Sequence, residues 1–335
     1  MSEVITDAIG VRDGAISANG SVAQRLLSSG FRTNSLRTLE TLRKDEWELL
    51  DTDIVEPGRE RLRAAGDLIS RGLVLPVPNG LGTTIVQHET ASEMTAADVS
   101  MDGRTRGEQD RIVFSLVSTP LPIIHKDFQL NIRALEASRN GGSPLDTTQA
   151  VEAAIQVSET VEGMVLNGFA ANDILGFGAS SGQLYGYTNA PNRNTSTLGT
   201  SWATDTGANI LADVLTMITG LQGDRMYGPY MLYVPTNSWV PLLDDFKAES
   251  DKTIIQRIKE IPEIIDVKPV DKLADDNVLM VQMTKNVVDM AIGMQPTVLQ
   301  WDTDGGMNLN FKVMSIMVPR MKSDYQSFSG VNHMS

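Results

Sequence analysis

Two motifs that are associated with enzyme active sites overlap within residues 174–192, ILGFGASSGQLYGYTNAPN. Gly176, Gly178 and Gly182 have a spacing close to that of a dinucleotide-binding loop, in which glycines let the backbone approach a pyrophosphate. The run Gly-Ala-Ser-Ser-Gly from Gly178 also matches the turn that presents the nucleophile of serine hydrolases, with Ser180 as the nucleophile. The segment therefore raises two chemistries, cofactor binding and acyl transfer.

Both chemistries need a strand before the motif and a helix after it. A long helical pattern and a polar turn precede Gly176 instead, and the glycine, asparagine and proline after Gly182 exclude a helix there. Only one histidine follows Ser180, His333, in a tail that we expect to be mobile. We predict neither site, and interpret the segment as a glycine-rich bend that packs back on the body through Leu175, Phe177, Leu184 and Tyr185.

The sequence also lacks a convincing pattern of metal ligands. There is no cysteine, which excludes disulfides, thiol nucleophiles and thiolate ligands, and a multi-histidine site would need His88, His125 and His333 to converge. Asp302, Asp304 and Gly305 open a calcium-loop pattern, but Val313 stands near the twelfth position, where such a loop needs glutamate. We therefore expect a hairpin turn at this place, and no metal or cofactor site in the chain.

Two of the histidines lie in predicted strands. His88 could be a ligand or a switch, but a partly exposed, hydrogen-bonded histidine is our preferred interpretation. The triplet His125, Lys126 and Asp127 contains the parts of a general base with an orienting acid. Adjacent residues of a strand point to opposite faces, so His125 and Lys126 would not share a site. No catalytic residue is predicted.

The composition is that of a globular protein with an acidic surface. The 335 residues suffice for one large or two medium domains, and 41% of them are hydrophobic and 21% charged. There are 42 acidic and 28 basic residues, a net charge of -14, which disfavours a dedicated nucleic-acid binder because phosphates are repelled. No apolar run approaches the roughly 18 residues of a membrane span, and the N-terminus lacks a signal-peptide pattern. We expect neither membrane insertion nor secretion.

The first part of the chain predicts an arm and two helices. Residues 1–34 are small, polar and glycine-dotted, which is typical of an arm that becomes ordered against something else. Helical spacing begins at Ser35 and returns over residues 59–73. We expect the arginines of this second helix to lie on a solvated face and to pair with nearby acids: Arg59, Arg61 and Arg63.

A projecting hairpin follows. Residues 83–91 and 111–117 have strand patterns, and the intervening residues 91–110 are polar and nearly free of large apolar groups. A hairpin of this kind is poorly stable alone and is stabilised by a neighbour. Residues 120–138 then predict a strand followed by a short helix.

Residues 147–169 have the longest helical pattern in the chain. Asp146 and Gln149 fit a capping box at its start. About 22 residues at about 1.5 Å each give a rod of roughly 33 Å, which suggests a spine of the molecule. The apolar stripe of this helix consists of Val151, Ala154, Ile155, Val161 and Val165.

The sequence that follows alternates between helix and strand patterns, which is typical of a compact α/β layer, and the C-terminal part is β-rich. Tyr230, Leu232 and Val234 alternate in one strand, and Thr236 or Asn237 is expected to cap the next helix. Methionines crowd the last third of the chain, where core filling is a better explanation than an adaptable contact surface. They are Met280, Met283, Met290, Met294, Met307, Met314, Met317 and Met321.

This order of parts resembles that of the major capsid proteins of tailed phages and of the related encapsulin shell proteins. Four stretches carry the likeness: LRKDEWELLDTDIVEPGRERL, STPLPIIHKDFQL, VEGMVLNGF with ILGFGASSGQLYGYTNAP, and GPYMLYVPTNSWVPLL. In encapsulin-like shells the matching places look like a tryptophan-acid helix, a Pro-Leu strand, a glycine-containing connector and a Gly-Pro-Tyr strand. The likeness spans roughly residues 36–320, and the order of the motifs carries it.

The resemblance implies an α+β capsid fold with a definite domain organisation. It has an N-terminal arm, an extended hairpin loop, a peripheral domain with a spine helix, and an axial domain. The implied segments are residues 1–50 for the arm and its helix, 51–75 for a helix leading to the loop, 76–120 for the extended loop, 121–199 for the peripheral domain with its spine helix at 147–169, 200–290 for the axial domain, and 291–335 for return strands of the peripheral domain and a C-terminal tail.

The resemblance also implies a function. The chain would be a structural subunit, not an enzyme, that assembles into the hexamers and pentamers of an icosahedral phage head around double-stranded DNA. The alternative is an encapsulin-type compartment that encloses a cargo enzyme. The implied partners are other copies of the chain, a portal, a separate scaffolding protein and decoration proteins, with DNA enclosed without sequence-specific binding and no membrane.

The implied location is the virion, after assembly in the host cytoplasm. Some members of the family join subunits through a lysine, an asparagine and a catalytic glutamate. No pattern here selects Lys126, Lys285 or Asn286 for that role, so we expect no covalent crosslink.

Overall fold

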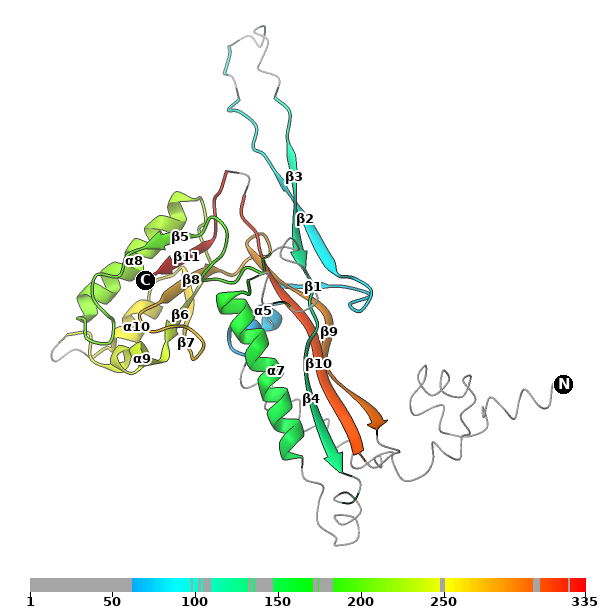
Figure 1. Ribbon diagram of the computed structural model, residues 1–335. Coiled ribbons are helices and arrows are strands. Elements are labelled where there is room, and N and C mark those ends of the chain that lie inside the picture. The colour runs from blue at the N-terminus through cyan, green and yellow to red at the C-terminus, as the bar shows by residue number, and fades with distance from the viewer. Residues whose placement is uncertain are drawn as a thin grey trace. The chain divides into compact units, whose positions relative to one another are not determined.

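The computed structural model describes most of the chain beyond residue 61 (Figure 1). The predicted arm, the helix from Ser35 and the motif residues Gly176, Gly178, Ser180 and Gly182 lie outside the described residues. Among the described residues, 126–153 and 298–313 belong to one compact unit, and 62–125, 154–297 and 314–335 belong to another. The described residues are 62–97, 99–101, 104, 110–131, 133, 135, 147–170, 174, 183–247, 251–303, 308–324 and 326–335.

The second of these units contains a five-stranded sheet with helices, as the alternating pattern predicts. The strand order is β5-β11-β8-β6-β7, with β11 parallel to β5 and antiparallel to β8, and β6 antiparallel to β8 and parallel to β7. The strands are β5 (Asn194–Ser196), β6 (Tyr230–Pro235), β7 (Ile264–Val270), β8 (Val278–Gln282) and β11 (Val331–Met334). The helices are α8 (Gly207–Gly223), α9 (Thr236–Trp239), η2 (Pro241–Leu243) and α10 (Ile254–Lys259).

Alternate side chains of β6 lie on opposite faces of this sheet. Tyr230, Leu232 and Val234 share a core with α8, α10, β7 and β8, which confirms the predicted alternation. Met231 and Tyr233 are also fully buried, on the opposite face, so the strand is covered on both sides. Burial of both faces is typical of a strand in the interior of a sheet with helices on it.

The C-terminal residues form a strand, not the mobile tail that we expected. β11 lies between β5 and β8, and all four of its residues are buried. His333 in this strand has Nε2 2.7 Å from Asn277 Oδ1, and its Nδ1 accepts a hydrogen bond from Arg193 Nε at 3.4 Å. Burial, followed by the charge of Arg193, lowers the pKa of His333. The backbone pairing with β8 holds the segment in place.

The expected cap of the helix after β6 is wrong. Pro235 occupies the N-cap position and no side chain caps the helix. Thr236 instead donates a hydrogen bond from Oγ1 to Asp271 Oδ1 at 2.8 Å, because it is already inside this one-turn helix. The cap of α8 is conventional: the side chain of Thr206 accepts a hydrogen bond from the backbone N–H of Asn209.

A four-stranded sheet with the order β1-β9-β10-β4 accounts for the β-rich C-terminal part (Figure 1). Its strands are β1 (Val74–Pro76), β4 (Ile124–Asn131), β9 (Val288–Thr303) and β10 (Asn308–Met321). The Phe128 and Phe311 rings stack at 5.0 Å between β4 and β10. The prediction of methionines as core is confirmed for Met280, Met283, Met290, Met314, Met317 and Met321, which are buried; Met294 is partly buried, and Met307 lies outside the described residues.

The predicted long helix is α7 (Thr148–Asn167), whose 20 residues span about 30 Å. Ala154, Val161 and Val165 of the expected stripe are buried, while Val151 and Ile155 are partly buried. The expected cap at Asp146 lies outside the described residues. After the helix, an isolated bridge joins Phe169 to Leu184. Of the expected anchors of this bend, Leu184 is buried and Tyr185 is exposed; Leu175 and Phe177 lie outside the described residues.

The chain leaves α7 through Gly168, which has a left-handed conformation with φ +66°. A Cβ at this position would lie 2.2 Å from Leu184 O. We expect Gly168→Ala to lower the free energy of unfolding by about 2 kcal/mol, because alanine is strained at positive φ and has no room here. Denaturant unfolding measures the change. Gly163→Ala within α7, where an added Cβ meets no atom within 4 Å, is the control and should be neutral or stabilising; equal losses in the two variants would contradict this account of Gly168.

Candidate functional site

The predicted hairpin is confirmed as two antiparallel strands, β2 (Ile85–Ala91) and β3 (Phe114–Pro120) (Figure 1). Their register runs from Ile85 opposite Pro120 to Ala91 opposite Phe114. The two strands form a sheet of their own, with no third strand among the described residues. A hairpin without a third strand or a helix on its face has little stability in water.

One face of this hairpin, which we call the outward face, carries exposed apolar side chains. The register places Phe114 and Leu116 of β3 on the same side as Ile85 and Glu89 of β2. Phe114 is 64% exposed and Leu116 is 55% exposed. Phe114 and Leu116 are neighbours on this face, and adjoining exposed apolar side chains are a feature of protein contact surfaces. Further exposed apolar residues lie close in sequence to the hairpin strands: Leu81, Met94, Val99, Met101 and Val113.

The opposite face of β2, which we call the inward face, is partly buried at Val86, His88 and Thr90. Beyond this strand, the Glu93 carboxylate accepts hydrogen bonds from Arg225 Nη1 at 3.1 and 3.2 Å and from Gln326 Nε2 at 3.1 Å. These groups are exposed, so the ion pair stabilises the structure by at most about 1 kcal/mol. Apart from its partly buried inward face, the first arm of the hairpin is therefore held by weak polar contacts.

Three charged residues, which we call the Asp289 cluster (Asp289, Arg320 and Lys322), lie where β9 begins and β10 ends; Asp289 and Arg320 are buried and Lys322 is partly buried. Arg320 donates from Nε and Nη2 to the two carboxylate oxygens of Asp289 at 2.7 and 2.6 Å, and Lys322 Nζ donates to Asp289 Oδ2 at 2.7 Å. Burial alone would raise the pKa of Asp289, but the hydrogen bonds and charges of Arg320 and Lys322 outweigh it and lower that pKa. The cluster carries one net positive charge.

His88 on the inward face is influenced by this cluster. Burial, followed by the charges of Arg320 and Lys322, lowers the pKa of His88, and Asp289 raises it by less. Among the described residues, His88 Nδ1 is buried and has no hydrogen-bond partner. Our expectation of a hydrogen-bonded strand histidine is therefore wrong at this nitrogen, because no acceptor or donor of the inward face reaches it.

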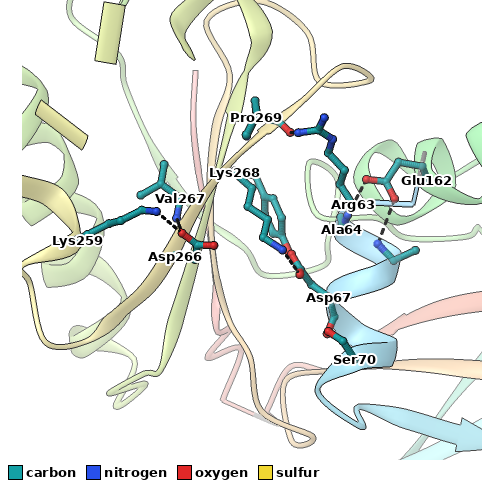
Figure 2. Close-up of polar contacts among 12 residues, drawn as sticks. Arg63, Ala64, Asp67, Ser70, Glu162, Lys259, Asp266, Val267, Lys268 and Pro269 are labelled. Carbon is teal, nitrogen blue, oxygen red and sulfur yellow. Dashed lines mark hydrogen bonds and ion pairs between the residues drawn. The ribbon is translucent and has the colours of Figure 1, made fainter. Parts of the chain in front are cut away.

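A second buried polar cluster joins α5 (Ala64–Ser70) to α7 (Figure 2). Glu162 of α7 is 3% exposed, and its two carboxylate oxygens accept hydrogen bonds from the backbone N–H groups of Ala64 and Ala65 at 2.7 and 3.1 Å. Burial raises the pKa of Glu162 to about 7, although these backbone hydrogen bonds favour the charged form. Glu162 thus provides acceptors for two backbone N–H groups at the start of α5, at the cost of a buried charge.

Asp67 extends this cluster to the five-stranded sheet. Its carboxylate forms an ion pair with Lys268 of β7 and accepts a hydrogen bond from the Tyr233 hydroxyl of β6 at 3.1 Å (Figure 2). The Tyr233 ring stacks on Tyr187 at 5.9 Å, and the Tyr187 hydroxyl is buried without a partner among the described residues. These contacts connect α5, α7, β6 and β7 within one unit.

A cavity of about 1030 Å³ lies beside these residues, but its charges are paired with one another. Lys259 contacts Asp266 at 2.6 Å and Lys272 contacts Glu159 at 2.7 Å. Exposed Arg63 donates to the carbonyl of Pro269 at 3.2 Å, so its partner is a backbone group and not the acid that we expected; Arg59 and Arg61 lie outside the described residues. The lining therefore fastens secondary-structure elements together and presents no activated nucleophile.

The other residues considered for chemistry do not converge. His125 and Lys126 are both exposed, and so are Lys285 and Asn286. Asp304 and Gly305 of the calcium-loop pattern lie outside the described residues. The described parts of the chain contain no group of histidine and acidic residues that could hold a metal ion. No described helix is long and apolar enough to cross a membrane.

Another exposed patch lies in the unit that contains residues 298–313. Leu299 and Trp301 of β9 are exposed, and Lys312 Nζ lies 5.7 Å from the centre of the Trp301 ring. Lys312 also forms an ion pair with Asp127 at 3.5 Å. An exposed aromatic ring with a cation on its face is a second candidate contact surface.

Sequence reasoning found the hairpin but missed the two buried polar clusters. Glu162 had a signal, since an acid interrupts the apolar stripe of α7 between Val161 and Val165. Asp289 and Arg320 had no local signal, because they are 31 residues apart in sequence. Their pairing depends on the register of β9 with β10.

Comparison with known proteins gives one family and several shell proteins. The model of the family described as "Family of unknown function (DUF6260)" matches residues 35–334. The Type 1 encapsulin shell protein EncA of Myxococcus xanthus (strain DK1622) is 24% identical over 294 residues, covering 84% of this chain and 90% of EncA.

Two solved structures are similar in fold. The virus-like particle from Pyrococcus furiosus has a TM-score of 0.59 at 18% identity, covering 86% of this chain and 99% of that one. The capsid of Myoviridae Phage XM1 has a TM-score of 0.59 at 14% identity, covering 79% of this chain and 90% of that one. The expected α+β fold shared by tailed-phage capsid proteins and encapsulin shell proteins is confirmed. The chain belongs to the DUF6260 family, and its fold is that of capsid and encapsulin shell subunits.

Proposed function

We propose that this chain is a non-enzymatic structural subunit that assembles with copies of itself into a closed shell. The observation that carries the proposal is the hairpin of β2 and β3, whose outward face leaves Phe114 and Leu116 largely exposed among the described parts of the chain. Assembly would bury this face and so supply the stability that an isolated hairpin lacks.

We further propose that the shell is the icosahedral head of a tailed phage, built from hexamers and pentamers around double-stranded DNA. The net charge of -14 supports this proposal, because an acidic wall does not bind the enclosed DNA tightly. The partners would include a portal, a separate scaffolding protein and decoration proteins, and the location would be the virion after assembly in the host cytoplasm.

An encapsulin-type compartment around a cargo enzyme is the second candidate. The 24% identity with EncA, a Type 1 encapsulin shell protein, over 90% of its length favours this candidate. Purified shells distinguish the two, since a phage head would contain DNA and a compartment would contain a co-purifying enzyme. Neighbouring terminase and portal genes, or a neighbouring cargo gene, give an independent answer.

The proposed domain roles follow from the resemblance. We propose residues 200–290 as the axial domain, residues 76–120 as the extended loop and α7 as the spine of the peripheral domain, with residues 291–335 as its return strands and tail. The five-stranded sheet also includes β5 and β11, which lie outside residues 200–290. Through these two strands, the last residues of each peripheral segment, 121–199 and 291–335, would join the sheet of the axial domain.

Negative-stain microscopy tests the proposal. We expect the wild-type chain to form closed particles, and the double variant Phe114→Ser, Leu116→Ser to remain as folded subunits, because it removes the apolar outward face. Deletion of residues 91–110 should have the same effect. The control is Phe114→Leu, Leu116→Met, which keeps the face apolar and should assemble. A wild-type chain that stays monomeric under all conditions, including with a scaffolding partner, would rule out the shell; normal shells from the serine variant would rule out the role of the hairpin.

A further inference from the structure

The inward face of the hairpin contains a histidine, His88, with one ring nitrogen that is buried and has no hydrogen-bond partner among the described residues. His88 lies opposite Val117 in the β2–β3 register, with Val86 and Thr90 on the same side of β2. The nitrogen without a partner is Nδ1. A neutral imidazole can leave one ring nitrogen unprotonated, whereas an imidazolium must donate from both.

The charges that face His88 oppose its protonation. They belong to the Asp289 cluster, in which Arg320 and Lys322 bring two positive charges and Asp289 one negative charge. The Asp289 carboxylate already accepts three hydrogen bonds from these two residues, and both of its oxygens are engaged. The β3 residues across from the inward face, Ser115, Val117 and Thr119, are uncharged, and Glu89 lies on the outward face.

We propose that His88 is an acid-operated release for the hairpin: protonation of its ring forces the inward face of β2 away from the Asp289 cluster and into water. The proton would enter a buried nitrogen without an acceptor, beside a net positive charge, so the imidazolium is stable only where water solvates it. The hairpin is free to respond because the Glu93 contacts that also hold it are weak.

The sign of the effect follows from the lowered pKa of His88. The packed hairpin binds fewer protons than the released one, so packing is favoured above the ordinary histidine pKa of about 6.5 and is lost as the pH falls below it. Under the proposed function, on which this step rests, mild acid would regulate assembly by detaching the arm that reaches the neighbouring copy.

Thiol labelling of the full-length, unassembled chain tests the release, since the chain has no native cysteine. Val86→Cys places a thiol on the inward face, and Gln87→Cys places the matched control on the exposed face of the same strand. The ratio of their labelling rates removes most of the intrinsic pH dependence of the thiol. We expect the Val86→Cys to Gln87→Cys ratio to rise by about threefold or more from pH 7.5 to 5.5.

Variants of the charged groups assign the effect to His88. His88→Gln should make the ratio independent of pH, whereas His125→Gln, which removes the exposed histidine of β4, should leave the rise intact. Lys322→Gln removes one of the opposing charges, which narrows the pKa difference between packed and released His88, and should make the rise smaller than in the wild type. A ratio that does not change with pH, or that still rises in His88→Gln, overturns the proposal.

Particle formation at the same pH values separates this inference from the proposed function. Fewer shells at pH 5.5 than at 7.5 in the wild type, with no such difference in His88→Gln, supports the inference. Shells that form equally at both pH values, with a constant labelling ratio, overturn the release and leave the shell function intact. An absence of shells at every pH overturns the shell function, while the labelling ratio still decides the release.

Discussion

Replacing Asp289 with asparagine is expected to lower the free energy of unfolding of the subunit by about 3–5 kcal/mol. Asp289 is fully buried and Arg320 is 5% exposed, so the variant leaves a cation in the interior without its counter-charge. The two-pronged hydrogen bonding of Arg320 to Asp289 also loses one of its acceptors. Denaturant unfolding of the unassembled chain, followed by circular dichroism, measures the loss.

The control for this prediction is an ion pair of the same type at the surface. Asp266→Asn breaks the contact between Asp266 and Lys259. Both of these side chains are substantially exposed, so the free energy of unfolding should fall by at most about 1 kcal/mol. Arg320 and Asp289 could also be replaced together, by methionine and leucine; this removes the more deeply buried cation with its counter-charge and leaves only Lys322, which is 19% exposed, so it should recover part of the loss. A loss for Asp289→Asn no larger than that for Asp266→Asn would show that the Asp289 cluster is not a buried charge system.

Glu162 is expected to make the stability of the subunit depend on pH in the opposite direction to most carboxylates. Its pKa is about 7 in the folded chain and 4.5 as a free side chain, so the folded state holds the proton more tightly. The stabilising contribution is complete below pH 4.5 and is lost as the pH rises through about 7. The shift corresponds to about 3 kcal/mol.

The measurement compares the wild type with Glu162→Gln, whose neutral side chain resembles the protonated acid. We expect the unfolding free energy of the wild type, relative to this variant, to fall by about 3 kcal/mol between pH 4.5 and 8. Glu159→Gln, one turn earlier in α7 and paired with Lys272, should show no such relative change. A wild type and Glu162→Gln with parallel pH profiles would mean that Glu162 is not a buried, uncompensated charge.

Local patterns were sufficient to predict the elements that depend on neighbouring residues. The period of the apolar residues located α7, and the alternation in β6 was correct to the residue for Tyr230, Leu232 and Val234. The hairpin was also predictable, because two strand patterns enclose a polar segment. The order of these parts then carried the resemblance to shell proteins.

Features that depend on distant pairing could not be predicted in this way. His333 was assigned to a mobile tail because it stands close to the end of the sequence, whereas β8 and β5 pair with its strand on both sides. The partners of Asp289 and Glu162 are likewise far away in sequence, at Arg320 and at Ala64. The burial of a charged side chain cannot be predicted without knowing the partner that compensates its charge.

The five-stranded sheet cannot be completed until β11, the last of its strands in the sequence, has been synthesised. β5 is made before β6, β7 and β8, yet its place in the sheet is beside β11, residues 331–334. Until those residues emerge, β5 has no strand to pair with and β8 has an open edge, which is a site for pairing with other chains. A ribosome that stopped before Val331 would therefore release a subunit whose β8 edge is open to pairing with other chains.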